Sequence, residues 1–374
     1  MKFNVVIVGG GPAGLSTGVA FANAGASVAL IEKETYPRDK ICAGILTSKT
    51  ISFLNQHIPS LNIEQFFSTN YLSLFFKDQQ AIHTPIKNPF VLVDRKQFDF
   101  ELMNICMEFG IYILEGKKVS TLNPSKNIIQ LNDGQSITYD FLVAADGVHS
   151  TIRKFLGVHE ISSAFCIQNS FERRFCPKPL ADLQELQLYF GNIPFGYSWL
   201  VPNNKYIFIG TGVFTNNFNW TQLQQKHNEL CSKIFPANTS KCRGAHVPIG
   251  EVLNQTDYYN ENIIFVGDAA GLANPLTGEG IYYALLSGFL ACQAYIDNPE
   301  RFKTTYLSLL QTTANKLKEE KSLLTSFYDN SMLENVFFQF KDYPEYLANA
   351  CDEVVSLEKR SYLSLFTELK ALFR

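Results

Sequence analysis

The chain lacks the cysteine patterns that stabilise small secreted folds or hold metal ions. It has 8 Cys and 6 His in 374 residues, and no two cysteines form a Cys-x-x-Cys pair. No Cys or His cluster has the spacing of a zinc site, so we predict no bound metal. Because no secretory signal peptide precedes the first predicted strand, we expect reduced thiols and a cytoplasmic location.

Charge of either sign is also scarce. Charged residues make up 18% of the chain, and 32 Lys+Arg against 35 Asp+Glu leave a formal charge of −3. A nucleic-acid binder would show a basic stripe, so we expect no nucleic-acid partner. The 46% of hydrophobic residues excludes wholesale disorder. The uncharged run 281–296, in the long helix expected near Gly280, is shorter than the ~20 residues that span a bilayer, which predicts a soluble or peripheral protein.

Aromatic residues, in contrast, are plentiful, with 31 Phe and 17 Tyr. Most such rings fill protein cores, but they also suit a site for a bulky apolar ligand.

The first 32 residues have the pattern of a βαβ unit. The Val- and Ile-rich run 3–8 predicts a buried parallel strand, 15–24 a helix that ends at Gly25, and 27–31 a second strand closed by Glu32. The connecting turn is Gly9-x-Gly11-x-x-Gly14, with Pro12 and Ala13 inside it. Such glycines permit a tight turn, a close approach to a pyrophosphate and close helix–strand packing, and the helix N-terminus attracts the phosphates.

Glu32 stands 18 residues after Gly14, near the place where an acid accepts hydrogen bonds from ribose hydroxyls. An acid there disfavours a 2′-phosphate, so the pattern predicts FAD or NAD and not NADP. The glycines leave the choice between FAD and NAD open.

Two further motifs follow predicted buried strands. Residues 141–145 end in Asp146-Gly147, with Ser150 and Arg153 downstream. Residues 263–266 end in Gly267-Asp268, followed by the segment 275–281, Pro-Leu-Thr-Gly-Glu-Gly-Ile. With three motifs in this order, the sequence resembles the FAD-dependent oxidoreductases of the p-hydroxybenzoate hydroxylase type. The resemblance implies FAD as the cofactor.

The resemblance also implies a role for each motif. It places the Asp-Gly turn near flavin and nicotinamide, the Asp268 carboxylate on the sugar region of FAD, and Arg95 against the cofactor. The helix opened by Gly278 and Gly280 can direct N–H groups at the flavin, whereas Glu279 is interpreted as a helix-dipole partner. The predicted cofactor-binding residues are Gly9, Gly11, Pro12, Ala13, Gly14, Glu32, Lys33, Cys42, Ala43, Arg95, Asp146, Gly147, Gly267, Asp268, Gly278, Gly280 and Ile281.

Two segments narrow the resemblance. Residues 36–44, Tyr-Pro-Arg-Asp-Lys-Ile-Cys-Ala-Gly, are similar to the PxxKxCxG segment of the geranylgeranyl reductase family, with Ala43 where Gly is common. Residues 195–202 are similar to that family's YxWxFP strand, which lines the substrate cavity, with Val201 in place of the usual Phe. The resemblance implies Cys42 as a catalytic residue that supplies or relays a proton. It implies Tyr197, Trp199 and Pro202 as substrate-binding residues.

We therefore predict an α/β fold: a Rossmann-type FAD-binding domain, p-hydroxybenzoate hydroxylase-like, with an inserted antiparallel-sheet substrate domain and C-terminal helices. The predicted FAD domain is discontinuous and comprises residues 1–70, 90–157 and 256–300. The substrate domain comprises 71–89 and 158–255, and the helical region 301–374. Asp94 is a predicted N-cap of a helix to Glu108, 77–80 a hairpin turn, Asn132-Asp133-Gly134 another, and 220–235 a helix.

The resemblance leads to one principal function and two alternatives. The principal one is a reductase that transfers a hydride from reduced flavin N5 to double bonds of an isoprenoid or other lipid-like substrate. The alternatives are a monooxygenase that hydroxylates or epoxidises a small apolar or aromatic molecule through a C4a-hydroperoxyflavin, and a flavoprotein that senses or binds without turnover. NAD(P)H or another reductant, such as ferredoxin, is the expected electron donor. The C-terminal helices either cover the substrate domain or contact a membrane surface, and the oligomeric state stays open.

Overall fold

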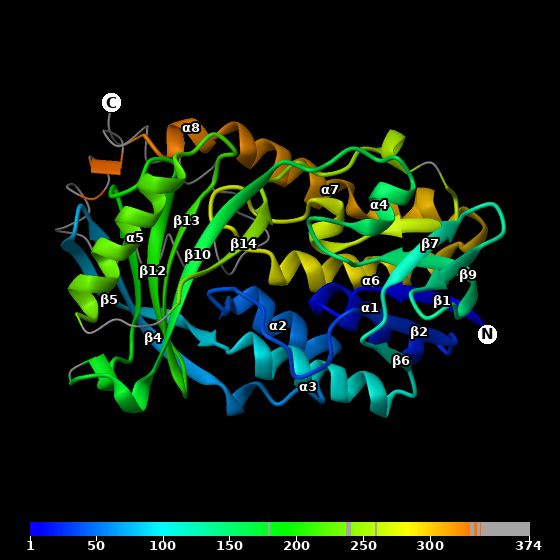
Figure 1. The fold of residues 1–374 in the computed structure, drawn as a ribbon, viewed down its shortest axis with the longest axis horizontal. Helices are drawn as coiled ribbons and strands as arrows, with labels where there is room; N and C mark the ends of the chain where they lie inside the picture. Colours follow the sequence, from blue (N-terminus) through cyan, green and yellow to red (C-terminus); the bar gives the residue numbers. More distant parts are fainter. Residues whose placement is uncertain (179, 237–240, 259, 330–332, 335–336, 338–374) are drawn as a thin grey trace.

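The computed structural model describes residues 1–374 except 179, 237–240, 259, 330–332, 335–336 and 338–374. The described chain forms two sheets that lie side by side, each with its own helices (Figure 1). None of the helices in these described residues is long and apolar enough to cross a membrane. The predicted helices and membrane contact of residues 338–374 lie outside the described residues.

The first sheet has seven strands in the order β6-β2-β1-β9-β8-β7, with β15 paired to β9. Its central strands are parallel, and their apolar runs are buried between helices, as the continuous Val and Ile patterns predict. The strands are β1 (Lys2–Val8), β2 (Val28–Glu32), β6 (Tyr112–Glu115), β7 (Val119–Asn123), β8 (Ile128–Leu131), β9 (Ser136–Ala144) and β15 (Ile263–Phe265). The helices of this part are α1 (Pro12–Asn23), α2 (Ser48–His57), α3 (Arg95–Glu108), α4 (Thr151–Phe155), α6 (Ile281–Asp297) and α7 (Phe302–Ser322), which leads to α8 (Leu324–Phe327).

The second sheet has eight strands in the order β14-β10-β13-β12-β11-β4-β5-β3. They are β3 (Ile45–Leu46), β4 (Phe67–Phe76), β5 (Gln79–Leu92), β10 (Ser163–Glu172), β11 (Leu186–Phe190), β12 (Gly196–Pro202), β13 (Tyr206–Val213) and β14 (Arg243–Pro248). The expectation of a wholly antiparallel sheet is wrong at one pair, because β11 runs parallel to β4. These two strands come from distant segments, so no hairpin sets their relative direction.

Several local predictions are confirmed. The Asp94 side chain accepts a hydrogen bond from the Lys96 N–H at 3.0 Å and caps α3. The Asn132–Gly134 turn joins β8 and β9 as an antiparallel hairpin. The turn between β4 and β5 is tighter than the predicted 77–80, because Lys77 and Asp78 alone adopt positive φ values of 47° and 65°.

The structure also adds elements that the sequence pattern did not predict. Helix α2 follows a loop and buries three side chains, Thr50, Phe53 and Leu54. Strand β3 and residues 90–92 of β5 belong to the second sheet although they fall in the segments predicted for the FAD domain. The division into domains stays a prediction.

The two faces of the second sheet differ in what they contact. Helix α5 (Trp220–Ile234) packs on one face, where Leu230 and Cys231 meet Leu200 and Ile207. The other face carries Trp199 and Val201 and borders the loop after β2 through Ile41 and Ala43. We call this second face, formed by the strand residues of that apolar cluster, the apolar sheet face; Leu333 and Phe337, from the segment after α8, pack against it.

A buried polar network ties α5 to the sheet. His227, which is fully buried, contacts Thr211 Oγ1 through Nδ1 at 3.1 Å and Asn169 Oδ1 through Nε2 at 2.6 Å. Burial lowers the pKa of His227 to about 4. The imidazole is therefore neutral in the folded protein at pH values where the unfolded chain already binds a proton.

This shift predicts a pH-dependent stability. As the pH falls from about 6.5 to about 4, the unfolded chain takes up a proton that native His227 does not, which costs about 3 kcal/mol of stability. A His227→Gln variant keeps an amide that can hydrogen-bond, but it does not titrate. We expect urea unfolding to show a smaller loss of stability between pH 7 and pH 4.5 in the variant than in the wild type. Equal losses in the two proteins would contradict this account of His227.

Candidate functional site

The three sequence motifs meet at one edge of the first sheet. Strands β1, β9 and β15 are parallel neighbours whose ends are level, with Val8 and Phe265 both paired to Ala144. The turns that follow touch closely: a Cβ on Gly9 would lie 2.3 Å from the Ala145 carbonyl oxygen. A Cβ on Gly267 would lie 2.8 Å from that of Ala13. Ligands of open α/β sheets bind outside this carboxyl edge.

The first turn forms a cradle at the N-terminus of α1. A Cβ on Gly14 would lie 1.8 Å from the Gly9 carbonyl oxygen, whereas a Cβ on Gly11 would meet nothing within 4 Å. Pro12 begins the helix, and Gly11, as N-cap residue, offers no side chain to its first N–H groups. Open space in front of uncapped N–H groups fits an anion such as the pyrophosphate of FAD.

Glu32 lies beside this cradle at the end of β2. Its buried carboxylate accepts hydrogen bonds from the Gly10 N–H at 2.7 Å and the Glu34 N–H at 2.9 Å. Each carboxylate oxygen has a second lone pair, so the group can still accept a hydrogen bond from a ribose. The neighbouring Lys33 is exposed.

Sequence reasoning missed a buried ion-pair cluster that supports the same loop. Fully buried Asp99 binds Arg95 through two contacts, Nε–Oδ1 at 2.7 Å and Nη2–Oδ2 at 2.8 Å. Arg38 Nη2 lies 3.2 Å from Asp99 Oδ2 and donates to the Gly10 carbonyl at 2.8 Å. The Tyr36 hydroxyl donates to the same carbonyl. The i,i+4 spacing of Arg95 and Asp99 on a predicted helix could have indicated their pair, but no pattern indicated Arg38.

Arg95 joins this cluster to Cys42. Burial alone would lower the pKa of Arg95, but Asp99 and then the adjacent Cys42 outweigh it and raise that pKa. The Cys42 sulfur also accepts a hydrogen bond from the Gly44 N–H at 3.4 Å. The structure therefore brings the predicted catalytic thiol and the predicted cofactor arginine together.

Asp268, just beyond β15, is a partly exposed acceptor. Burial raises its pKa, and the positive charges of Lys40 and Arg95 counteract this only in part. Within the described part of the chain, no hydrogen bond engages its carboxylate. A Cβ on Gly280 would lie 3.5 Å from Asp268 Oδ1, so the carboxylate stands next to the start of α6. Such an acceptor fits the sugar hydroxyls of FAD.

Asp146 has a structural task that the sequence did not reveal. Its Oδ2 accepts hydrogen bonds from the Thr151 N–H at 2.6 Å and the Ile152 N–H at 3.1 Å, at the start of α4. Its Oδ1 is buried without a partner among the described residues, and burial raises the pKa of the group. Gly147 has a φ of 83°, and a Cβ there would meet nothing within 4 Å.

The turn before α6 contains two glycines and is anchored by contacts between Glu279 and the start of α2. Gly280 is the N-cap of α6, which begins at Ile281, and Gly278 adopts a φ of 71°. The interpretation of Glu279 as a helix-dipole partner is wrong, because it precedes the helix. Its carboxylate binds Lys49 Nζ and accepts from Thr47 Oγ1 at 2.8 Å. Its partners come from the start of the unpredicted α2.

Strand β12 brings the predicted aromatic residues to the same region. The Tyr197 hydroxyl donates to the Thr277 carbonyl at 2.6 Å and so links the second sheet to the turn before α6. Burial, together with Cys166, Cys42 and Glu279, raises the pKa of Tyr197. The strand alternation places Trp199 on the same face, whereas Pro202 falls on the α5 face, which separates it from the other two.

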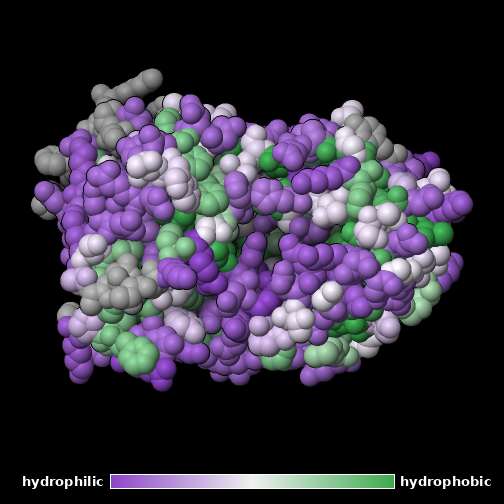
Figure 2. Space-filling view, in the orientation of Figure 1, coloured by the Kyte–Doolittle hydropathy of each residue, from purple (hydrophilic) through white to green (hydrophobic). Residues whose placement is uncertain are grey.

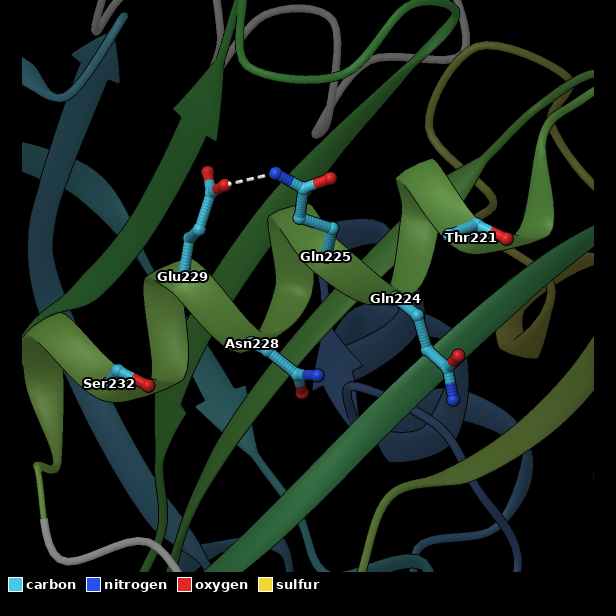
Figure 3. A pocket seen from close by; sticks show the side chains of 6 residues that line it. All are labelled: Thr221, Gln224, Gln225, Asn228, Glu229 and Ser232. Atoms are coloured by element: carbon cyan, nitrogen blue, oxygen red, sulfur yellow. Dashed lines mark hydrogen bonds between the residues drawn. The ribbon is translucent and has the colours of Figure 1, made fainter.

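The surface of the described residues was searched for hollows whose lining could hold a cofactor or a lipid. Figure 2 shows the visible face hollowed near its centre, between the two parts of the molecule. A groove on α5 is lined by polar side chains, and Gln225 Nε2 donates to Glu229 Oε1 at 2.9 Å beside it (Figure 3). It lacks the apolar lining of a cofactor or lipid site. Its lining residues are Thr221, Gln224, Gln225, Asn228, Glu229 and Ser232.

Comparison with known proteins defines the class. The model of the FAD binding domain family matches residues 2–293, so the chain belongs to this family of flavoproteins. The protein is an FAD-dependent oxidoreductase, and the predicted cofactor is confirmed.

Within this class, the predicted resemblance to geranylgeranyl reductases is confirmed. The chain is 27% identical to a geranylgeranyl diphosphate reductase of Rhodobacter capsulatus, over 95% of this chain and 89% of that protein. It is 25% identical to a digeranylgeranylglycerophospholipid reductase of Methanococcus vannielii, over 90% and 87%.

Solved structures confirm the predicted fold class. A geranylgeranyl bacteriochlorophyll reductase-like protein of Thermoplasma acidophilum matches with a TM-score of 0.79 at 17% identity, over 99% of both chains. The flavin-dependent brominase Bmp2 matches with a TM-score of 0.73 at 15% identity, over 100% of this chain and 99% of that one. Because reductase-like and brominase proteins share the fold, the fold alone does not select the reaction.

The geometry of the glycine turn predicts that alanine at Gly11 lowers FAD affinity, whereas alanine at Gly14 lowers the stability of the fold. Gly11→Ala places a Cβ in the open space where we expect a phosphate of FAD to bind. It should leave the melting temperature without FAD unchanged and lower the FAD affinity about tenfold or more. Gly14→Ala meets the Gly9 carbonyl, so we expect it to destabilise the fold by about 1–3 kcal/mol or more. Thermal unfolding and flavin titration of both apoproteins test this pair. Normal FAD affinity in Gly11→Ala would contradict the assignment of the cradle.

The two carboxylates are expected to contribute separately to FAD binding. Hydrogen bonds to charged groups are worth about 1.5–3 kcal/mol, so Glu32→Ala and Asp268→Ala should each weaken FAD binding at least about tenfold. The bound flavin per protein, measured by absorbance after purification, checks this result. Full occupancy in both variants would show that neither carboxylate binds the cofactor.

Proposed function

We propose that the protein reduces carbon–carbon double bonds of an isoprenoid or another lipid-like apolar substrate. The observation that carries this proposal is the position of the apolar sheet face, which borders the predicted FAD site at the Cys42 loop. A flavoprotein that acted on a small polar molecule would not need so large an apolar surface next to its cofactor.

The apolar sheet face is built from several strands. Large side chains from β4, β11, β12 and β13 point to it, and Ile41, Ala43 and Ile45 pack against its border. Aromatic rings gather around Tyr197, whose ring centroid lies 5.3 Å from that of Phe190 and 5.8 Å from that of Trp199. The ring of Phe214, in a neighbouring apolar cluster, lies 5.5 Å from it. The buried residues from the strands are Leu72, Leu74, Ile82, Ile86, Phe90, Leu92, Cys166, Leu186, Trp199, Val201 and Phe208.

The proposed chemistry depends on exclusion of water and on orientation. An isolated prenyl double bond has no carbonyl group to polarise, so its position relative to the hydride source sets the rate. The apolar face excludes water and orients the chain of the substrate. FAD, when bound and reduced by NAD(P)H or another reductant, would supply the hydride.

Cys42 is the proposed proton carrier. Its Sγ lies beside the Arg95 guanidinium, which is held in place by two contacts to Asp99. The guanidinium can donate a hydrogen bond to the sulfur and so holds the thiol in position. Glu32, Asp268 and the glycine cradle take no part in this step and hold the cofactor.

The similarity to proteins named geranylgeranyl diphosphate reductase and digeranylgeranylglycerophospholipid reductase supports this proposal. Their similarity extends along 90% or more of this chain and so includes both the first sheet and the apolar sheet face.

A direct test mixes the dithionite-reduced holoprotein with a prenyl lipid in the absence of oxygen. We expect the flavin to reoxidise and the lipid to gain two hydrogen atoms per reduced double bond, as measured by mass spectrometry. A fully saturated lipid of the same length is the control. If no prenyl lipid accelerates reoxidation beyond this control, the proposal fails.

The two tryptophans of the chain offer a matched pair of variants. Trp199 is buried in the apolar sheet face, whereas Trp220 is 46% exposed at the start of α5. We expect Trp199→Phe to weaken binding of a prenyl lipid about fivefold, through lost ring area, with the flavin content unchanged. Trp220→Phe should change neither quantity. Loss of flavin in Trp199→Phe would indicate a structural role for this residue instead.

A further inference from the structure

The turn before α6, residues 274–280, is anchored by a carboxylate from α7. The Asn274 side chain is buried, and its Oδ1 accepts hydrogen bonds from the N–H groups of Leu276 at 2.9 Å and Thr277 at 3.1 Å. Because this oxygen is used inside the turn, the amide nitrogen is left for a partner outside it. That nitrogen donates to Oε2 of Glu320 at 2.7 Å, and Glu320 is fully buried on α7.

Tyr328, which follows α8, contacts the same turn in two ways. Its hydroxyl donates to the Leu276 carbonyl at 2.5 Å, and the side chain is buried. Its ring stacks on that of Phe214, with the centroids 5.9 Å apart. A Cβ on Gly278 would lie 2.8 Å from Phe214, so the stacked rings lie directly against the turn. Tyr328 therefore supports the turn through one hydrogen bond and through a second ring.

Both anchors lie beyond the part of the chain that the family model matches, which ends at residue 293. In Figure 1, α7 and α8 extend from the first sheet to the second. The chain after α6 thus returns to the turn that leads into α6, at the edge of the sheet where the three motifs meet.

The turn sets the direction of the first N–H groups of α6. Within it, the N–H group of Gly278 donates to the Asn274 carbonyl at 2.9 Å. Gly280, the N-cap of α6, has no side chain to accept from the N–H groups at the start of the helix. An uncapped helix N-terminus stabilises negative charge, which the anionic form of reduced flavin carries and oxidised flavin does not. The orientation of this turn therefore affects the two redox states of FAD unequally.

We propose that Glu320 and Tyr328 are positioning residues of the cofactor site. They fix the 274–280 turn, so that the start of α6 is directed at the flavin and stabilises its reduced form. Both residues act through the turn. This role is independent of the proposed function, because it holds for any substrate of the bound flavin.

Tyr328→Phe tests this role through the loss of one oxygen atom, since the stack on Phe214 is kept. A redox titration of the holoprotein gives the midpoint potential of the flavin, and thermal unfolding of the apoprotein gives its stability. We expect the variant to weaken binding of reduced FAD about fivefold more than binding of oxidised FAD, the effect of one typical hydrogen bond. This ratio lowers the midpoint potential by about 20 mV.

Two variants of Glu320 provide a second test. Glu320→Leu removes the acceptor of the Asn274 amide and should lower the midpoint potential in the same direction. Glu320→Gln keeps an oxygen that can accept from this amide. Its potential should therefore stay closer to that of the wild type. If Glu320→Leu does not fold, Tyr328→Phe decides alone.

Tyr189→Phe is the matched control, because the Tyr189 hydroxyl also donates a hydrogen bond, to Gln187 Oε1 at 2.6 Å, but on the α5 face. It should lower at most the melting temperature and leave the potential unchanged. The positioning role is overturned if Tyr328→Phe and Glu320→Leu lower the melting temperature alone. It is also overturned if Tyr189→Phe lowers the potential as much as Tyr328→Phe does. Either result leaves the proposed function standing.

Discussion

The close contact of three turns at the carboxyl edge of the first sheet is the constraint on which the rest of the structure depends. Gly9 touches Ala145, Gly14 touches Gly9, and Gly267 touches Ala13, each at a distance that leaves no room for a larger residue. The contact is possible because β1, β9 and β15 are adjacent, parallel and level at their ends. It places an open cradle, a buried carboxylate and a helix N-terminus around one space, which is the arrangement that a dinucleotide cofactor requires.

The second sheet extends this space on one side. Its two faces are chemically distinct: one holds α5 through a polar network around His227, and the other is apolar and meets the Cys42 loop. Buried charged side chains lie where the Cys42 loop meets the first sheet. Asp99 holds Arg95 and Arg38, so a fixed positive charge stands beside the thiol and the glycine loop without exposure to water. The apolar sheet face thus borders the site where we expect FAD to bind.

The sequence predicted what depends on local chemistry. The βαβ unit, the strand-to-turn motifs and the Asp94 cap each depend on residues within a short segment of the sequence. The structure contains them at the predicted positions. Features that depend on distant partners were missed. Glu279 pairs with a lysine more than 200 positions away, and Arg38 gives no local sign that it will meet Asp99. A glutamine in a strand gives equally little indication of whether it will be buried, as Gln168 is.

The most direct measurement incubates the reduced holoprotein with a prenyl lipid in the presence of dissolved oxygen and then determines the mass of the lipid product by mass spectrometry. The account predicts a product that has gained two hydrogen atoms per double bond, in yields that rise when oxygen is withdrawn. A product that has gained an oxygen atom, with label from ¹⁸O₂, would contradict the reductase assignment and indicate a monooxygenase on the same fold.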